Sequence, residues 1–124
     1  NIKKEIGSKT IAAYKRCSNI LNSEEKIKKE NLGFADPGLF KNDYEKKLYK
    51  KINNIRKYFL DVGKDENYEE SLEILSSIKT EVNDFFDNVI VNDQDIIIKK
   101  NRLELLNMIC KTFDNYFNFS QIDG

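Results

Sequence analysis

Apolar residues recur every three or four positions along most of this chain, and this spacing constrains the fold more than any other feature. The spacing is clearest between residues 44 and 59. Its members, separated by steps of 4, 4, 3 and 4, are Tyr44, Leu48, Ile52, Ile55 and Phe59. Because one turn of an α-helix takes about 3.6 residues, these side chains share one helix face. We therefore expect an all-α fold.

The same spacing predicts a bundle of about five helices. The expected helices cover residues 2–22, 43–62, 68–76, 78–89 and 98–117. Residues 31–42 contain the only proline and two of the five glycines, which is typical of a loop.

Asn1 is not a methionine and Ile2 already fits the helical pattern. We therefore expect a single domain, residues 1–124, that is a fragment of a longer protein.

Short polar residues mark the expected helix ends. Asn42 or Asp43 is the expected N-cap of the helix that follows residue 42. Asn67 and Asp93 are the expected N-caps of later helices. Gly63 is suited to end the helix expected over residues 43–62. A break is also expected near residues 76–77, which are both serine.

Two expectations concern the segment between the first two long helices. Residues 23–25 (SEE) resemble a cap that opens a short polar helix, with Ile27 as its only apolar anchor. The loop that follows is expected to be held on the core by four large apolar residues, Leu32, Phe34, Leu39 and Phe40.

The composition excludes several classes of functional site. The chain has no histidine, so His-based triads, general bases and zinc ligands are not available. Cys17 and Cys110 are the two cysteines, and both fall on apolar helix faces, where we expect reduced and buried thiols. No phosphate loop, Rossmann glycine pattern or nucleophile elbow occurs, so we expect no catalytic residue, metal site or cofactor site in this chain. No apolar run approaches the ~18 residues that span a membrane, and a cytoplasmic protein without a membrane partner is expected.

The charge is divided between the two halves of the chain. The formal net charge is zero, with 21 basic and 21 acidic residues. Residues 1–60 hold 15 Lys or Arg against 7 Asp or Glu, a net of +8, and residues 61–124 hold 6 against 14, a net of −8. Such an asymmetry indicates a surface for a polyanion, which the summed charge conceals.

The basic residues are densest on the helix that follows Asn42. Seven basic and two acidic residues occur between residues 41 and 57. Rows of ammonium groups can replace the counterions of a phosphate backbone, and amide side chains can contact unpaired bases. The candidate nucleic-acid ligands on this helix are Lys46, Lys47, Lys50, Lys51, Asn53 and Lys57. Further candidates on the first and last helices are Lys15, Arg16, Asn19, Lys99 and Lys100. The alternative is a lysine-rich face that only keeps the protein in solution.

Arg102 falls within the apolar arc of the last helix. An unpaired buried guanidinium is too costly, so we expect a structural ion pair with a carboxylate from the preceding segment. Asp87, Asp93 and Asp95 are the candidate partners. Direct contact between Arg102 and a ligand is the alternative.

Four segments, in the same order, resemble the bacterial glycyl-tRNA synthetase β-subunit family. Residues 12–21 (AAYKRCSNIL) are similar to its A-x-K-R-x-x-N-I-L segment, and residues 85–91 (FFDNVIV) to its F-F-D-x-V-x-V segment. Residues 101–106 (NRLELL) resemble its N-R-L-x-L-L helix. The loop DPGLF at 36–40, followed by EKKLY at 45–49, is similar to its D-P-x-L-F … E-x-x-L-Y stretch.

The resemblance implies a helical anticodon-binding domain of the DALR type, related to the C-terminal domains of arginyl-tRNA synthetases. It implies that tRNA is the partner, together with the α subunit of a hetero-oligomeric glycine–tRNA ligase. It also implies that ATP and Mg²⁺ are used by the parent enzyme and that this fragment alone is not catalytic. The alternative is a helical module that docks subunits to one another through protein contacts.

Overall fold

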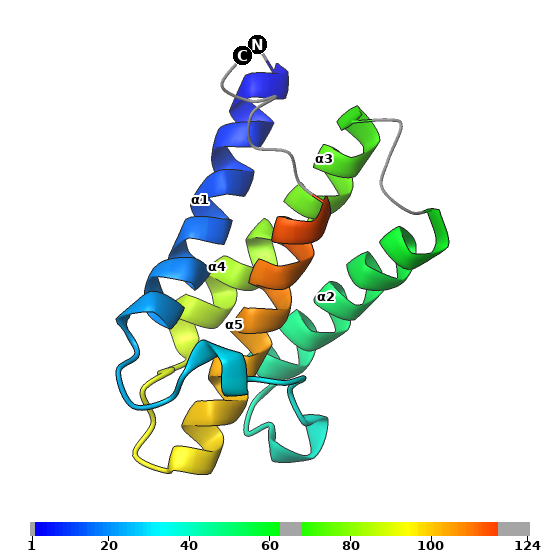
Figure 1. The fold of residues 1–124 in the computed structure, drawn as a ribbon. Helices are drawn as coiled ribbons and strands as arrows, with labels where there is room; N and C mark the ends of the chain where they lie inside the picture. Colours follow the sequence, from blue (N-terminus) through cyan, green and yellow to red (C-terminus); the bar gives the residue numbers. More distant parts are fainter. Residues whose placement is uncertain (1, 63–67, 117–124) are drawn as a thin grey trace.

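The chain folds into a helical bundle, which is seen in a computed structural model (Figure 1) that describes residues 2–62 and 68–116. Its α-helices are α1 (Ile2–Ser23), α2 (Asp43–Val62), α3 (Tyr68–Ser76), α4 (Lys79–Asn88) and α5 (Ile96–Tyr116). Two single-turn 3₁₀ helices, η1 (Lys29–Asn31) and η2 (Pro37–Leu39), lie in the long connection between α1 and α2. The described residues contain five α-helices and no strand, which confirms the prediction of an all-α bundle of about five helices.

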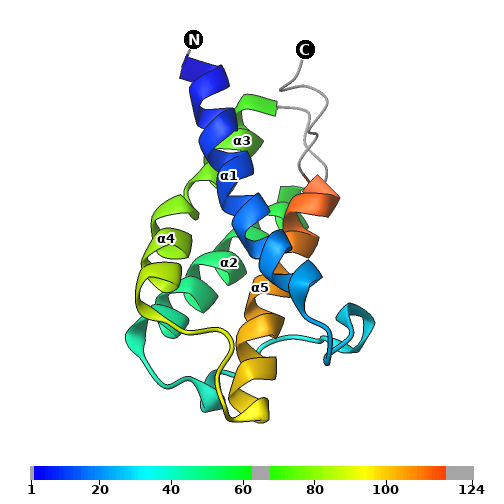
Figure 2. The same cartoon turned by 90° about the vertical axis from the view of Figure 1, so that its left-hand side faces the viewer.

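Helix α5 is the central element of the bundle. It packs against α1 on one side and α2 on the other, while α3 packs on α1 and α4 packs on both α1 and α2. The two views in Figures 1 and 2 show this arrangement, with the connection between α1 and α2 crossing the face of α5. Every other long helix therefore lies close to α5 or to a helix that α5 contacts.

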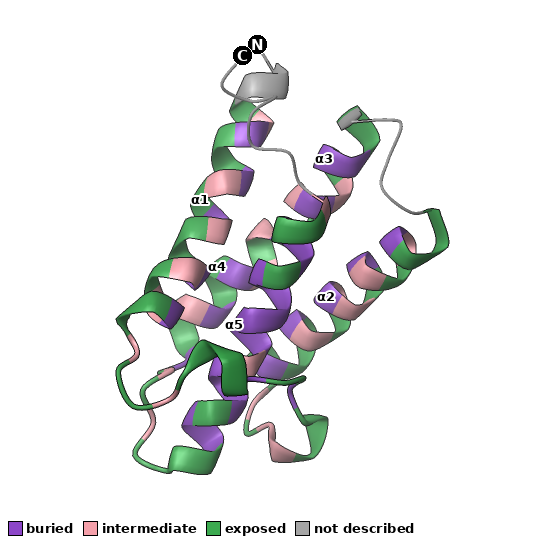
Figure 3. Ribbon diagram, in the orientation of Figure 1, coloured by how far each residue is buried: buried purple, intermediate pink, exposed green. Residues whose placement is uncertain are grey.

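The core follows the apolar faces predicted from the sequence. Phe59 of α2, Phe85 of α4 and Phe113 of α5 are fully buried, and each contributes about 1.5–3 kcal/mol by leaving water. Helix α5 is buried on most of its surface (Figure 3), as its wide apolar arc predicts. Cys17 and Cys110 are both buried and free, as expected.

The predicted short helix at residues 23–27 does not form. Ser23 instead ends α1, and its hydroxyl donates to the carbonyl of Ile20 at 2.8 Å. Glu24, which the short helix would have included, accepts a hydrogen bond from the amide of Lys26 and pairs with Lys99. With Ile27 as its only apolar anchor, the segment has too little surface to bury as a helix.

The predicted helix ends are confirmed at two places and wrong at one. The side-chain oxygen of Asn42 accepts a hydrogen bond from the amide of Glu45 at 3.0 Å, which is the geometry of an N-cap. The chain also breaks after α3, as expected, where the serines at 76 and 77 bond back to α3 carbonyls. Asp95 rather than Asp93 caps α5, since its carboxylate accepts from the amide of Ile97. The caps predicted at residues 63 and 67 lie outside the described residues.

Candidate nucleic-acid interface

The outer face of α2 carries an exposed row of lysines. Its apolar face is turned into the bundle, so the residues on the opposite side of the helix reach solvent. The exposed lysines are Lys46, Lys47, Lys50 and Lys57, which we call the α2 basic face. Lys46 lies 4.0 Å from Asp43, an exposed contact one turn away that contributes little energy. The ammonium groups of this face are accessible to an anionic partner.

Two other predicted residues of α2 are engaged within the protein. The ammonium of Lys51 lies 3.6 Å from a carboxylate oxygen of Glu81 on α4. The side-chain oxygen of Asn53 accepts a hydrogen bond from Arg56 at 3.2 Å. Both side chains are half-buried, so they contribute less accessible surface than their lysine neighbours.

The candidates on α1 form a separate exposed group. Lys15, Arg16 and Asn19 all reach the surface of α1. The Arg16 guanidinium stands 4.6 Å from the ring centre of Phe86 and donates to the side chain of Asn83, both on α4. Arg16 therefore ties α1 to α4 in addition to adding positive charge.

Lys99 differs from the other candidates because it is buried. Its ammonium lies 2.7 Å from a carboxylate oxygen of Glu24, and both side chains are 11% exposed. The hydrogen bond from Lys99 lowers the pKa of Glu24 below its usual value, which outweighs the opposite effect of burial. Lys99 is therefore held in an ion pair within the protein, so its ammonium is less accessible to a phosphate than that of its exposed neighbour Lys100.

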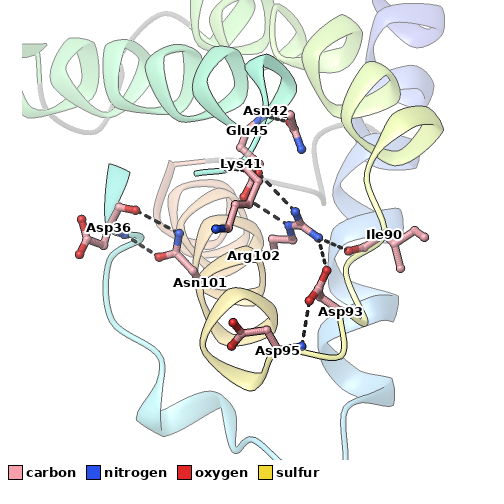
Figure 4. Close-up of polar contacts among 9 residues, drawn as sticks. All are labelled: Asp36, Lys41, Asn42, Glu45, Ile90, Asp93, Asp95, Asn101 and Arg102. Carbon is pink, nitrogen blue, oxygen red and sulfur yellow. Dashed lines mark hydrogen bonds and ion pairs between the residues drawn. The ribbon is translucent and has the colours of Figure 1, made fainter. Parts of the chain in front are cut away.

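Arg102 forms the centre of a buried polar network where α5 meets the start of α2 (Figure 4). Its Nε lies 3.3 Å from Oε2 of Glu45, and its Nη1 lies 3.3 Å from Oδ2 of Asp93. Nη1 also donates to the backbone carbonyl of Ile90 at 2.7 Å, and the Glu45 carboxylate accepts from the amide of Lys41 at 2.8 Å. The network joins α5, the α4–α5 connection and the first turn of α2.

The sequence predicted a paired Arg102 but missed its main partner. Asp93 is one of the expected partners, whereas Asp87 is exposed on α4 and is not a described contact of Arg102. Glu45, which is fully buried, takes that role, and Tyr44 beside it is 36% exposed although the apolar pattern included it. An asparagine at the N-cap followed three residues later by glutamate is the sequence pattern of a capping box, which marks the start of α2 but carries no information on the pairing of Glu45 with Arg102.

The connection between α1 and α2 is held on α5 by hydrogen bonds between its backbone and two side chains of α5. Asn101 accepts from the amide of Asp36 at 2.7 Å and donates to its carbonyl at 3.0 Å. Glu104 accepts from the amide of Gly33 at 2.8 Å. Leu32 is buried as predicted, but Phe34 is 67% exposed, so polar contacts do part of the anchoring expected of apolar side chains.

The sequence also matches a known domain family. Residues 10–123 match the family described as the DALR anticodon binding domain. The chain belongs to this family. The match includes all four short segments and confirms the DALR-type domain that the resemblance implied.

Three relatives of this DALR domain share one name. Glycine–tRNA ligase beta subunits of Rickettsia africae and Rickettsia conorii are each 40% identical to it over 118 residues, which is 95% of this chain and 17% of theirs. The subunit of Rickettsia bellii is 36% identical over 122 residues. The chain thus spans 17% of the length of these relatives.

The described part of the DALR domain offers neither a metal centre nor a membrane span. Within residues 2–62 and 68–116, no three acidic or cysteine side chains gather where they could hold a metal ion. None of the helices in these ranges is long and apolar enough to cross a bilayer. The α2 basic face is therefore the feature on which we base a function.

Proposed function

We propose that this DALR domain binds tRNA through the α2 basic face and serves a glycine–tRNA ligase β subunit. The observation that carries the proposal is the exposure of Lys46, Lys47, Lys50 and Lys57 on one helix of a domain that belongs to an anticodon-binding family. Lysines held on a rigid helix bind a phosphate backbone without first having to order a loop. The names of the relatives support glycine tRNA as the partner.

The remainder of the enzyme supplies the chemistry in this proposal. The parent attaches glycine to its tRNA with ATP and Mg²⁺, in the cytoplasm and together with an α subunit. In this proposal, ATP and Mg²⁺ are used by the parent enzyme and not by this domain. In this proposal the domain binds and positions the tRNA, and it supplies no catalytic group.

Charge reversal on α2 tests the proposal. The double variant Lys50→Glu/Lys57→Glu should bind glycine tRNA at least ~10-fold more weakly than the wild type, and its log–log salt slope should be shallower by about 1–2. Lys111→Glu is the control for a charge reversal elsewhere on the surface, because Lys111 is an exposed lysine of α5 outside the α2 basic face. Filter binding across a salt series gives both quantities.

Two results would contradict this function. One is a wild-type affinity for tRNA that does not change between low and high salt. The other is a double variant that binds tRNA as tightly as Lys111→Glu does, which would move the contact away from α2.

Docking to another protein is the second candidate function, and an exposed apolar pair favours it. Phe34 and Leu60 are 67% and 73% exposed, and both line a cavity of about 330 Å³ with α5. Large apolar side chains grouped at a surface are typical of protein interfaces. The occupant we propose is the α subunit, and Leu60→Lys should then abolish its capture by this domain while tRNA affinity stays unchanged.

A further inference from the structure

The surface between α2 and α4 contains a cleft with two walls of opposite charge. Its volume is about 430 Å³, within the range of about 300–1,000 Å³ that is typical of small-ligand sites. Lys47 and Lys50 line it from α2, and Glu81 and Asp84 line it from α4. The cleft adjoins the α2 basic face, with which it shares both lysines.

An aromatic ring completes the cleft. Tyr44 lines it from the first turn of α2 and keeps 36% of its surface exposed. Lys51 reaches from the same wall to within 3.6 Å of Glu81, so the two walls are already bridged by one ion pair. That bridge braces the two helices against each other beside the exposed ring.

One unpaired nucleotide has the chemistry that this cleft would bind. Its phosphate is an anion, its base has a π-face that stacks on aromatic side chains, and the edge of the base carries hydrogen-bond donors. The cleft offers ammonium groups on one wall, a tyrosine ring, and carboxylates on the other wall. A plain phosphate site would not need the acidic wall, which repels phosphate.

From this arrangement we infer that the cleft is a subsite for one unpaired nucleotide whose base carries an amino group. The inference rests on the proposed RNA-binding function and goes beyond it. The base stacks on Tyr44, its phosphate lies against Lys47 and Lys50, and its amino group donates to Asp84. Cytosine presents such an amino donor where uracil presents a carbonyl oxygen, and a carboxylate repels that oxygen.

Matched pyrimidine oligonucleotides test the subsite. Oligo(C) and oligo(U) of equal length differ in the amino donor and not in the size of the base. The wild-type chain should bind oligo(C) about 5-fold more tightly than oligo(U) in fluorescence anisotropy. Asp84→Ala should remove this preference without weakening the binding of oligo(U). Tyr44→Leu should weaken the binding of both by about 10-fold, and Tyr44→Phe, which keeps the ring, should not.

The outcomes separate the subsite from the proposed function. Equal affinity of the wild type for oligo(C) and oligo(U), or a Tyr44→Leu variant that binds like Tyr44→Phe, overturns the subsite. If tRNA still binds with a steep salt dependence in that case, the proposed function stands without it. If tRNA does not bind but the preference for oligo(C) and its loss in Asp84→Ala are observed, the subsite is supported and the tRNA proposal fails.

Discussion

Arg102 on α5 and Glu45 in the first turn of α2 form a buried ion pair between residues 57 positions apart in the sequence. Their side chains are 7% and 0% exposed, and Nε and Oε2 lie 3.3 Å apart. The same guanidinium also binds the carbonyl of Ile90 and the carboxylate of Asp93. The pair therefore fixes the start of α2, and with it the α2 basic face, relative to the central helix.

Removing one partner of this pair should destabilise the fold more than removing both. Glu45→Gln leaves the Arg102 guanidinium with less than its full charge compensation, and Arg102→Met leaves a buried carboxylate without a cation. Each should lower the free energy of unfolding by about 3–5 kcal/mol, as is typical when a buried pair is broken. Glu45→Gln/Arg102→Met should cost less than the sum of the two.

Urea unfolding monitored by circular dichroism measures all three variants. The control is the exposed pair of Glu5 and Lys9 on α1, whose charged atoms lie 3.2 Å apart. Lys9→Ala should cost no more than ~0.5 kcal/mol from the loss of that pair. Strictly additive costs in the double variant would contradict a direct coupling between Glu45 and Arg102.

Asn101 should control the local opening of the connection that crosses α5. Its side chain satisfies both the amide and the carbonyl of Asp36 and is 2% exposed. Asn101→Ala leaves both backbone groups without that partner, at a cost of about 1–3 kcal/mol. Hydrogen exchange at the Asp36 amide should accelerate by about 10-fold or more, while the amide of Ile52, in the middle of α2, should change only with global stability.

The ion pair of Glu24 and Lys99 should make part of the stability depend on acid pH. Because the pKa of Glu24 is lowered in the folded state by its bond to Lys99, folding favours the ionised carboxylate. This stabilisation is complete above the ordinary pKa of 4.5 and is lost as the pH falls below it. Glu24→Gln should therefore be less stable than the wild type at pH 7, and the difference should shrink toward pH 3.

Unfolding curves at several pH values measure this difference. Glu25→Gln is the matched control, because Glu25 is the exposed neighbour of Glu24. A gap between the wild type and Glu24→Gln that stays constant from pH 7 to pH 3 would show that the Glu24 charge contributes nothing.

The two cysteine thiols should be unreactive in the folded protein. Burial raises the pKa of Cys110 to about 12 and raises the pKa of Cys17 well above its usual value. At pH 8 the Cys110 thiolate is then on the order of one part in 10⁴, and only the thiolate reacts. A disulfide reagent should label both thiols at the rate of unfolding, whereas a thiol introduced by Ser8→Cys on the exposed face of α1 should react at once.

Secondary structure was predictable wherever one apolar face runs along a whole helix. The boundaries of α1 and α2 agree with the predicted residues 2–22 and 43–62 to within one residue at each end. The prediction failed at residues 23–27, because a polar segment with one apolar anchor depends on its tertiary contacts. There the ion pair of Glu24 and Lys99 replaces a helical turn.

The candidate site was predictable in its exposed part only. Lys46, Lys50 and Lys57 lie opposite the apolar face of α2, and a helix that buries one face must expose the other. The burial of Lys99 was not predictable, because it depends on an ion pair with Glu24, which is distant in the sequence. The spacing of residues along one helix carries no information on which side chains of other segments contact that helix.

The first turn of α2 separates what the sequence determined from what the tertiary structure decided. Both Tyr44 and Glu45 fit the spacing of the apolar face, because positions three and four before Leu48 lie on either side of it. Hydrophobicity favours burial of Tyr44, yet Glu45 is the buried residue and Tyr44 is exposed. The sequence determined that a helix forms here and which broad face turns inward. The tertiary structure decided which of the two residues is buried. The guanidinium of Arg102 inside the bundle requires a nearby carboxylate, and the packing of α5 against α2 brings Glu45 to it.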